Sequence, residues 1–176
     1  MKNDLVNELF STKTVLLEAI DGFSDQNFNS VPPVGGWTGG QVAEHVLLSA
    51  SGVADALNGP VKEADRDPEQ HVKLLSDIFL NFEMKLKSPD FILPSDAPKD
   101  KKNLVHLLGE TFDRIIHVAE SDNLDVICTT FEMPTLGMLS KKEFIWFTIV
   151  HTKRHIHQLN NILDQINQLN IKETIQ

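Results

Sequence analysis

Two histidines near the C-terminus have a spacing that suits metal binding. His151 and His155 stand four residues apart, so on a helix their imidazoles share one face, one turn apart. Two such rings can converge on one divalent ion, as helical histidine pairs do in zinc sites. Hydrogen bonds can also satisfy such a pair. This helix alone leaves both interpretations open.

The surroundings of the pair predict a buried position. The same helical face carries an apolar stripe of the kind that turns toward a bundle interior, made of Phe144, Phe147, Leu159 and Ile162. Because bare imidazoles are costly to bury, we expect a metal or hydrogen-bond partners beside them. His45 lies in a second apolar run between Val42 and Val53, so it too should point inward, and it is the natural third ligand.

The other four histidines have no such arrangement. His157 lies about 200° around the helix from His155 and should face solvent. His71 and His106 have no partner of matching spacing and are expected to be structural or solvated. His117 could face inward from its own helix and line the site.

Composition excludes several classes of function. The chain has 176 residues, of which 41% are hydrophobic, and a net charge of −9. This size fits one domain, which we place at residues 1–168, followed by a frayed tail at 169–176. An acidic chain without a basic stripe is unsuited to nucleic acids and to anionic membranes.

Other features indicate a cytoplasmic location. The single cysteine, Cys128, rules out an intramolecular disulfide, which a reducing compartment does not require. The segment MKNDLVNELF has acids and Asn where a signal peptide would need an apolar core. No apolar run is long enough to span a bilayer. We therefore expect a soluble cytoplasmic protein.

The apolar periodicity predicts helices and no regular strands. Pairs with the spacing of capping boxes, Thr38 with Gln41 and Ser140 with Glu143, mark two helix starts. Residues 123–139 read as irregular, with a short extended arm over TTFEMPTLGML. The fold class is therefore all-α, a helix bundle, with a connection between 59 and 100 long enough for a crossover. The expected helices are 3–22, 38–57, 67–87, 101–121 and 140–167.

Three segments carry a family resemblance: GGWTGGQVAEHVL, FEMPTLGMLSKKEF and FTIVHTKRHIHQL. Together they resemble the DinB/YfiT-like superfamily of metal-dependent helix bundles. In that family a Trp precedes the Ser or Thr that opens a helix, and a His follows one to two turns later. Its last long helix carries two histidines four apart, often followed by an amide and an aliphatic residue. The matching residues are Trp37, Thr38, His45, His151, His155, Gln158 and Leu159.

The resemblance implies a DinB-like four-helix bundle with up-down-down-up directions. It also implies three histidine ligands to zinc or nickel, which transfer to His45, His151 and His155. The chain departs from the family at Gly39 and Gly40, which are poor helix formers at a helix start. A second departure is Val61–Lys87, which looks like an extra helix between the second and third bundle helices and could cover or reshape the pocket.

Three neutral imidazoles leave at least one coordination position of a divalent ion open, as catalytic sites do. Imidazoles alone suit zinc, nickel, copper or iron. An open site can promote hydrolysis or activate a thiolate. Some relatives use low-molecular-weight thiols, so the resemblance favours a transferase or hydrolase acting on a small molecule. Relatives are often dimers, which implies a homodimer.

Candidate helpers and alternatives accompany this interpretation. Gln158 and Arg154 lie within one turn of His155 and could bind a ligand or substrate, whereas Glu44 should point away from His45. In an alternative, the bundle stores or senses a metal or small ligand without turnover. A third alternative is a degenerate relative that holds no metal.

Overall fold

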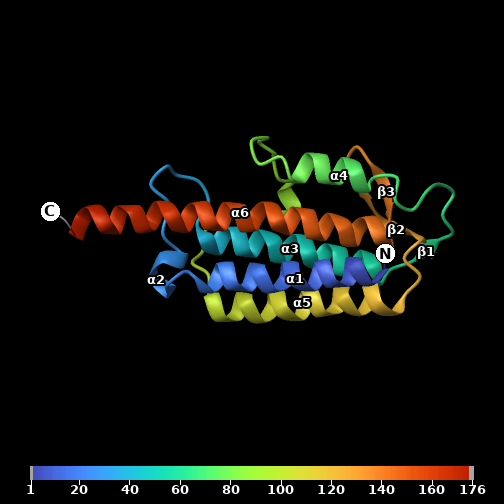
Figure 1. Cartoon of the computed structure of the whole chain (residues 1–176), viewed down its shortest axis with the longest axis horizontal. Coiled ribbons are helices and arrows are strands. Elements are labelled where there is room, and N and C mark those ends of the chain that lie inside the picture. The colour runs from blue at the N-terminus through green and yellow to red at the C-terminus, as the bar shows by residue number, and fades with distance from the viewer. Residues whose placement is uncertain (1, 175–176) are drawn as a thin grey trace.

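Four long helices form a bundle in the computed structural model, which describes residues 2–174. They are α1 (Lys2–Asp21), α3 (Gly39–Leu57), α5 (Lys101–Ser121) and α6 (Lys141–Thr174). α1 and α3 each pack against both α5 and α6. α1 and α6 run in one direction and α3 and α5 in the other (Figure 1).

The starts of two bundle helices follow from local hydrogen bonds. The Thr38 hydroxyl accepts from the backbone N–H of Gln41 at 3.1 Å, and the Gln41 amide oxygen accepts from the N–H of Thr38 at 3.0 Å. Ser140 and Glu143 exchange the same pair of bonds at 2.9 and 3.0 Å. Both predicted capping boxes are confirmed, and each satisfies backbone donors that a helix start otherwise leaves open.

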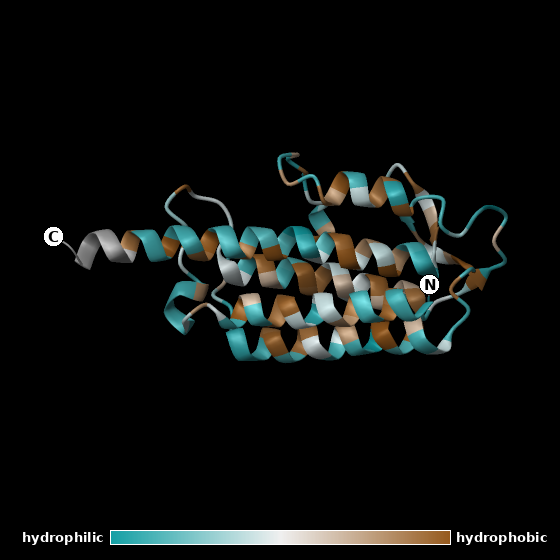
Figure 2. Ribbon diagram, viewed as in Figure 1, coloured by the Kyte–Doolittle hydropathy of each residue, from teal (hydrophilic) through white to brown (hydrophobic). Residues whose placement is uncertain are grey.

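The core lies between the four long helices. Apolar residues gather on their inward sides (Figure 2), because each helix repeats apolar positions every three to four residues. Burial of these side chains is the main term that stabilises the bundle. The largest fully buried side chains include Phe23, Phe28, Phe112, Phe144, Leu16 and Leu108.

The predicted helix over 67–87 is wrong in length. Only α4 (Val72–Phe79) is α-helical there. Beyond it, the Asn81 side chain accepts from the N–H of Glu83, and the Arg154 guanidinium donates to the carbonyls of Phe79, Asn81 and Met84. Because the Arg154 side chain binds these carbonyls, they do not accept the backbone hydrogen bonds that would continue the helix. The helix therefore ends earlier than the apolar periodicity predicts. The short helices α2 (Asp25–Phe28) and η1 (Asp90–Ile92) were also not predicted.

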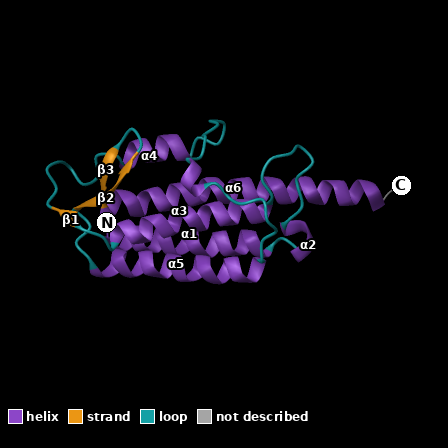
Figure 3. Cartoon of the chain, turned by 180° about the vertical axis from the view of Figure 1, so that it is seen from behind, coloured by secondary structure: helices purple, strands orange, loops and turns teal. Residues whose placement is uncertain are grey.

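A small antiparallel sheet corrects the all-α prediction. β1 (Val61–Lys62), β2 (Ile127–Met133) and β3 (Gly137–Ser140) pair in that order, at one end of the bundle (Figure 3). The turn between β2 and β3 uses positive φ angles at Thr135 and Gly137. Sequence periodicity missed the sheet because its strands are short and β1 pairs with a segment far along the chain. The extended arm expected within 129–139 is the β2–β3 hairpin.

The last helix is longer than expected. α6 continues to Thr174 and extends past the other bundle helices (Figure 1). The tail expected to fray from residue 169 is thus helical through 174, and the last two residues of that expectation lie outside the described residues. Within 2–174, no helix is long and apolar enough to cross a membrane.

A buried ion pair ties the segment between α3 and α4 to the start of α6. Glu143 is fully buried and accepts two bonds from the Arg66 guanidinium, at 2.6 and 2.9 Å. The same carboxylate accepts from the backbone N–H groups of His71 and Ser140. Because these donors come from the segment before α4 and from the end of β3, one carboxylate fixes where α4 lies on α6.

We expect Glu143→Gln to lower the free energy of unfolding by about 2–3 kcal/mol, because it leaves the Arg66 charge without its partner. The control is Asp77→Asn, in the exposed Lys73–Asp77 pair, which should change it by less than about 0.5 kcal/mol. Urea unfolding followed by circular dichroism measures both. Equal effects of the two substitutions would contradict the role assigned to Glu143.

Candidate metal centre

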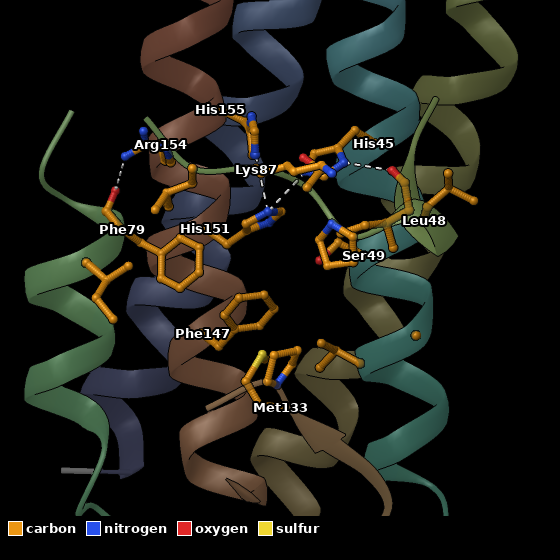
Figure 4. A pocket seen from close by; sticks show the side chains of 18 of the residues that line it. His45, Leu48, Ser49, Phe79, Lys87, Met133, Phe147, His151, Arg154 and His155 are labelled. Carbon is orange, nitrogen blue, oxygen red and sulfur yellow. Dashed lines mark hydrogen bonds between the residues drawn. The ribbon is translucent and has the colours of Figure 1, made fainter. Parts of the chain in front are cut away.

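Three histidines from two antiparallel helices meet inside the bundle. His45 comes from α3, and His151 and His155 come from consecutive turns of α6 (Figure 4). The Nε2 atom of His151 lies 3.2 Å from the Nε2 atoms of both His45 and His155. All three side chains are buried, with exposed fractions of 1%, 6% and 7% in chain order.

The outer nitrogens of two of these rings are held by oxygen acceptors. Nδ1 of His45 lies 2.8 Å from the backbone carbonyl oxygen of Ile92, and Nδ1 of His155 lies 2.9 Å from the amide oxygen of Gln158. A carbonyl oxygen only accepts, so each Nδ1 carries the proton and donates. Each neutral ring therefore turns an Nε2 lone pair toward the centre.

This proton assignment leaves the centre of the cluster short of protons. His151 can place one proton on Nε2 and donate it to only one neighbour at a time. The other neighbour then faces it across 3.2 Å with no shared proton. A cation between the three nitrogens would satisfy all of them at once.

The spacing also fits a transition metal. Zn–N bonds of 2.0–2.1 Å in a tetrahedral site separate the nitrogens by roughly 3.3 Å. The nearest pairs here are 3.2 Å apart, and the ligand atoms of all three residues lie within 4.8 Å of one another. The residues present thus fit a three-histidine site, and the outer hydrogen bonds match those that orient ligands in known sites.

Burial keeps the cluster uncharged. Desolvation lowers the pKa of His45, with the hydrogen bond to Ile92 opposing it. Desolvation is the largest cause, and the neighbouring histidines the next, of a pKa of His151 well below its ordinary value. Desolvation and His45 lower the pKa of His155 to about 3, although Gln158 opposes the shift. Neutral imidazoles are the form that binds metals.

Aromatic rings enclose the three imidazoles. Phe147 stacks on His151 with ring centroids 5.1 Å apart, and Phe79 of α4 meets the same ring edge-on at 5.6 Å. Trp37 lies 5.0 Å from the ring of His45. These contacts restrict ring rotation and shield the site from bulk water.

The cluster forms part of the wall of a large cavity. The cavity measures about 1830 Å³ and lies between α3, α6, α4 and the β2–β3 hairpin. This exceeds the volume of a typical small-molecule pocket, about 300–1,000 Å³. The cavity reaches solvent, because residues on its wall, such as Phe82 and Phe91, are exposed. A small molecule can therefore approach the histidines from outside.

The two proposed helpers have different surroundings. Gln158 contacts the cluster directly through its bond to His155. Arg154 also lines the cavity, but its guanidinium binds the carbonyls at the end of α4. Glu44 forms an ion pair with Lys99 at 2.7 Å, which agrees with the expectation that it points away from His45.

The remaining histidines lie outside the cluster. His157 is exposed and stacks on Phe82 with ring centroids 4.3 Å apart. His106 is exposed beside Glu110, and His71 precedes α4. His117 is exposed on α5, so the suggestion that it lines the site is wrong. A position between two apolar residues, Ile116 and Val118, is ambiguous in sequence, since one residue is 100° of rotation.

Sequence reasoning missed the part played by the segment between α4 and α5. The carbonyl of Ile92, in that segment, holds His45. Phe79 and Lys87 also line the cavity, but they belong to Val61–Lys87, the stretch that was expected to cover or reshape the pocket. A backbone carbonyl has no residue signature, and this segment read as a loop and a helix end.

The pKa shifts predict a pH-dependent stability for protein freed of metal. In the unfolded chain these histidines have a pKa of 6.5, whereas the pKa of His155 in the folded protein is about 3. The unfolded state thus binds more protons below pH 6.5, so the free energy of unfolding falls as pH falls. Each such histidine contributes up to about 1.4 kcal/mol per pH unit.

We expect EDTA-treated protein to lose stability more steeply between about pH 6.5 and pH 5 than its His155→Gln variant does. His106→Gln is the control, because its 68% exposed side chain should leave the slope as in the wild type. Chemical unfolding at a series of pH values measures the slopes. Identical slopes for wild type and His155→Gln would contradict a buried, uncharged His155.

Comparison with known proteins places the chain in a family. The model of the DinB superfamily matches residues 9–159, a span that includes α3 and the part of α6 that carries His151 and His155. No curated protein and no solved structure gives a significant match. Because the family model covers most of the sequence, the chain belongs to the DinB superfamily.

Proposed function

We propose that His45, His151 and His155 bind one divalent transition metal, zinc or nickel, and that the protein is a metal-dependent enzyme acting on a small molecule. The observation that carries the proposal is the convergence of three Nε2 atoms on the wall of a solvent-connected cavity. Three protein ligands with room for a fourth are typical of catalytic rather than structural sites.

Two classes of reaction suit such a site: thiol-dependent S-transfer and hydrolysis. A bound divalent metal supplies Lewis-acid chemistry that favours ionisation of a thiol or a water. The low-molecular-weight thiol expected from the family resemblance fits in the cavity beside the three imidazoles. The transferase is the first choice, and the hydrolase is the second.

The chain's own residues would hold and orient the reacting groups. Ile92 and Gln158 fix the rings of His45 and His155 so that their Nε2 atoms face the centre. Phe147 and Phe79 pack on His151 and exclude water from one side. No carboxylate is among the residues that contact the three rings in the described chain, so a reacting thiol would have to lose its proton to solvent or to a second substrate.

A non-catalytic bundle that stores or senses a metal is the alternative. It would be favoured if the Val61–Lys87 segment closed off the site. The cavity that adjoins the histidines is open to solvent, which supports turnover over storage.

Metal content tests the proposal directly. Untagged protein should contain about one zinc or nickel per chain by elemental analysis, and His151→Ala should contain nearly none, because only two of the three protein ligands of such a site remain. His157→Ala, which removes an exposed histidine on the same helix, should keep the metal. Equal metal in wild type and His151→Ala would refute the site.

The same three proteins separate enzyme from storage protein. Metal-loaded wild type and His157→Ala should transfer small thiols to an electrophile or hydrolyse a small ester, and His151→Ala should do neither. A loaded protein that is inactive across a broad panel of thiols, electrophiles and esters would favour the storage alternative.

The hydrogen bond from His155 to Gln158 predicts an effect on affinity. Gln158→Leu should raise the zinc dissociation constant about 10–100-fold, because such outer contacts orient the ligand and raise its basicity. Asn161→Leu is the matched control: Asn161 is an amide one turn further along α6 that bonds to His157 instead. Competition with a chelating dye measures both, and unchanged affinity in Gln158→Leu would contradict the role.

A further inference from the structure

The cavity is an elongated groove that continues well beyond the three histidines. Its wall on α3 extends from His45 to Ala56, and its wall on α6 from Asn161 to Phe144. The eleven residues from His45 to Ala56 correspond to a helix rise of about 16 Å. Since α3 and α6 are antiparallel, the groove leads from the histidines toward the β2–β3 hairpin, with Phe147 and Met133 beyond the cluster (Figure 4).

The distal part of the groove is apolar. Phe144 and Phe147 of α6 and Phe131 and Met133 of β2 line it. On the outer wall, large apolar side chains face solvent: Phe82, Met84 and Phe91 are 45%, 40% and 64% exposed. Such a concentration of exposed apolar surface around one cavity is typical of a site that an apolar ligand covers.

A glycine in the middle of α3 widens the groove. Gly52 lines the cavity, and a Cβ at this position would meet nothing within 4 Å. Glycine inside a helix is destabilising by about 0.5–1 kcal/mol relative to alanine. Close packing does not require Gly52, so its visible effect is to leave room for an occupant.

The charges on the cavity wall favour an anionic head group. Lys85, Lys87 and Arg154 line the cavity against Glu83 and Asp55, and Asp55 is already paired with Arg114 outside it. This lining therefore has a positive excess in a chain whose net charge is −9. Lys87 lines the same cavity as the three imidazoles.

We propose that the ligand of this site is an anionic amphiphile. Its negatively charged head lies at the three histidines and Lys87, and its unbranched apolar tail lies between α3 and α6, past Gly52 toward β2. The assignment of the head to a metal rests on the proposed function, whereas the tail groove requires no metal.

The test uses straight-chain carboxylates as probes: hexanoate, octanoate and decanoate, titrated calorimetrically into metal-free and zinc-loaded protein. Burial of each added CH2 should tighten binding up to about fourfold in both forms. Chain-length dependence in protein that fails to bind zinc would support this groove while refuting the metal site. Affinity that stays flat with chain length in both forms would overturn the amphiphile proposal and leave the metal site standing.

Two glycine substitutions make the test specific. Gly52→Phe should fill the groove and abolish the gain from octanoate to decanoate while zinc still binds. Gly109→Phe is the matched control, because Gly109 also has open space at its Cβ but lies on α5, away from the cavity. Decanoate binding in Gly52→Phe equal to that of the control would overturn the proposed tail position.

Lys87→Gln tests the head group. The substitution should weaken octanoate binding severalfold and leave the affinity for 1-octanol unchanged, because only a charged head group interacts with the lysine. An equal effect on both probes would overturn the assigned orientation. Zinc titration of the same variant confirms that the histidine cluster is intact.

Discussion

The structure depends on one electrostatic constraint: three buried, uncharged imidazoles turn their Nε2 atoms toward one another on the wall of a cavity. Oxygen acceptors on the outer side of two rings fix their protons away from the centre, so the inner lone pairs cannot all be satisfied by one another. Burial opposes protonation as a remedy. A cation shared by the three rings would satisfy the inner nitrogen of each one.

The rest of the fold serves to hold that arrangement. α3 and α6 are long and apolar on one side, and a capping box stabilises the start of each helix. The buried Glu143 carboxylate attaches the segment before α4 to α6, and α4 in turn brings Phe79 against His151. The short sheet closes the far end of the cavity, where Phe131 and Met133 contribute to its wall. Local helix signals and a few long-range polar contacts thus cooperate.

The sequence predicted those parts that depend on local repetition. The four long helices, both capping boxes and the shared face of His151 and His155 follow from residue spacing of three to four. The place of His45 beside them was expected from its apolar run and from the family resemblance. The sheet and the end of α4 could not be predicted in this way, because β1 pairs with β2 more than sixty residues later and Arg154 binds carbonyls more than seventy residues earlier. The cavity was also beyond reach, since its lining combines segments whose proximity only the packed chain creates.

The bond from His45 to the carbonyl of Ile92 has an evolutionary consequence. A main-chain oxygen is present whatever amino acid occupies the position, so mutation can change the side chain at 92 and its neighbours while the imidazole keeps its orientation. The stretch from Leu80 to Leu93 contributes side chains to the cavity wall. Selection can therefore remodel what enters this protein by sequence drift in one loop, without disturbing the donor atoms on the helices beneath.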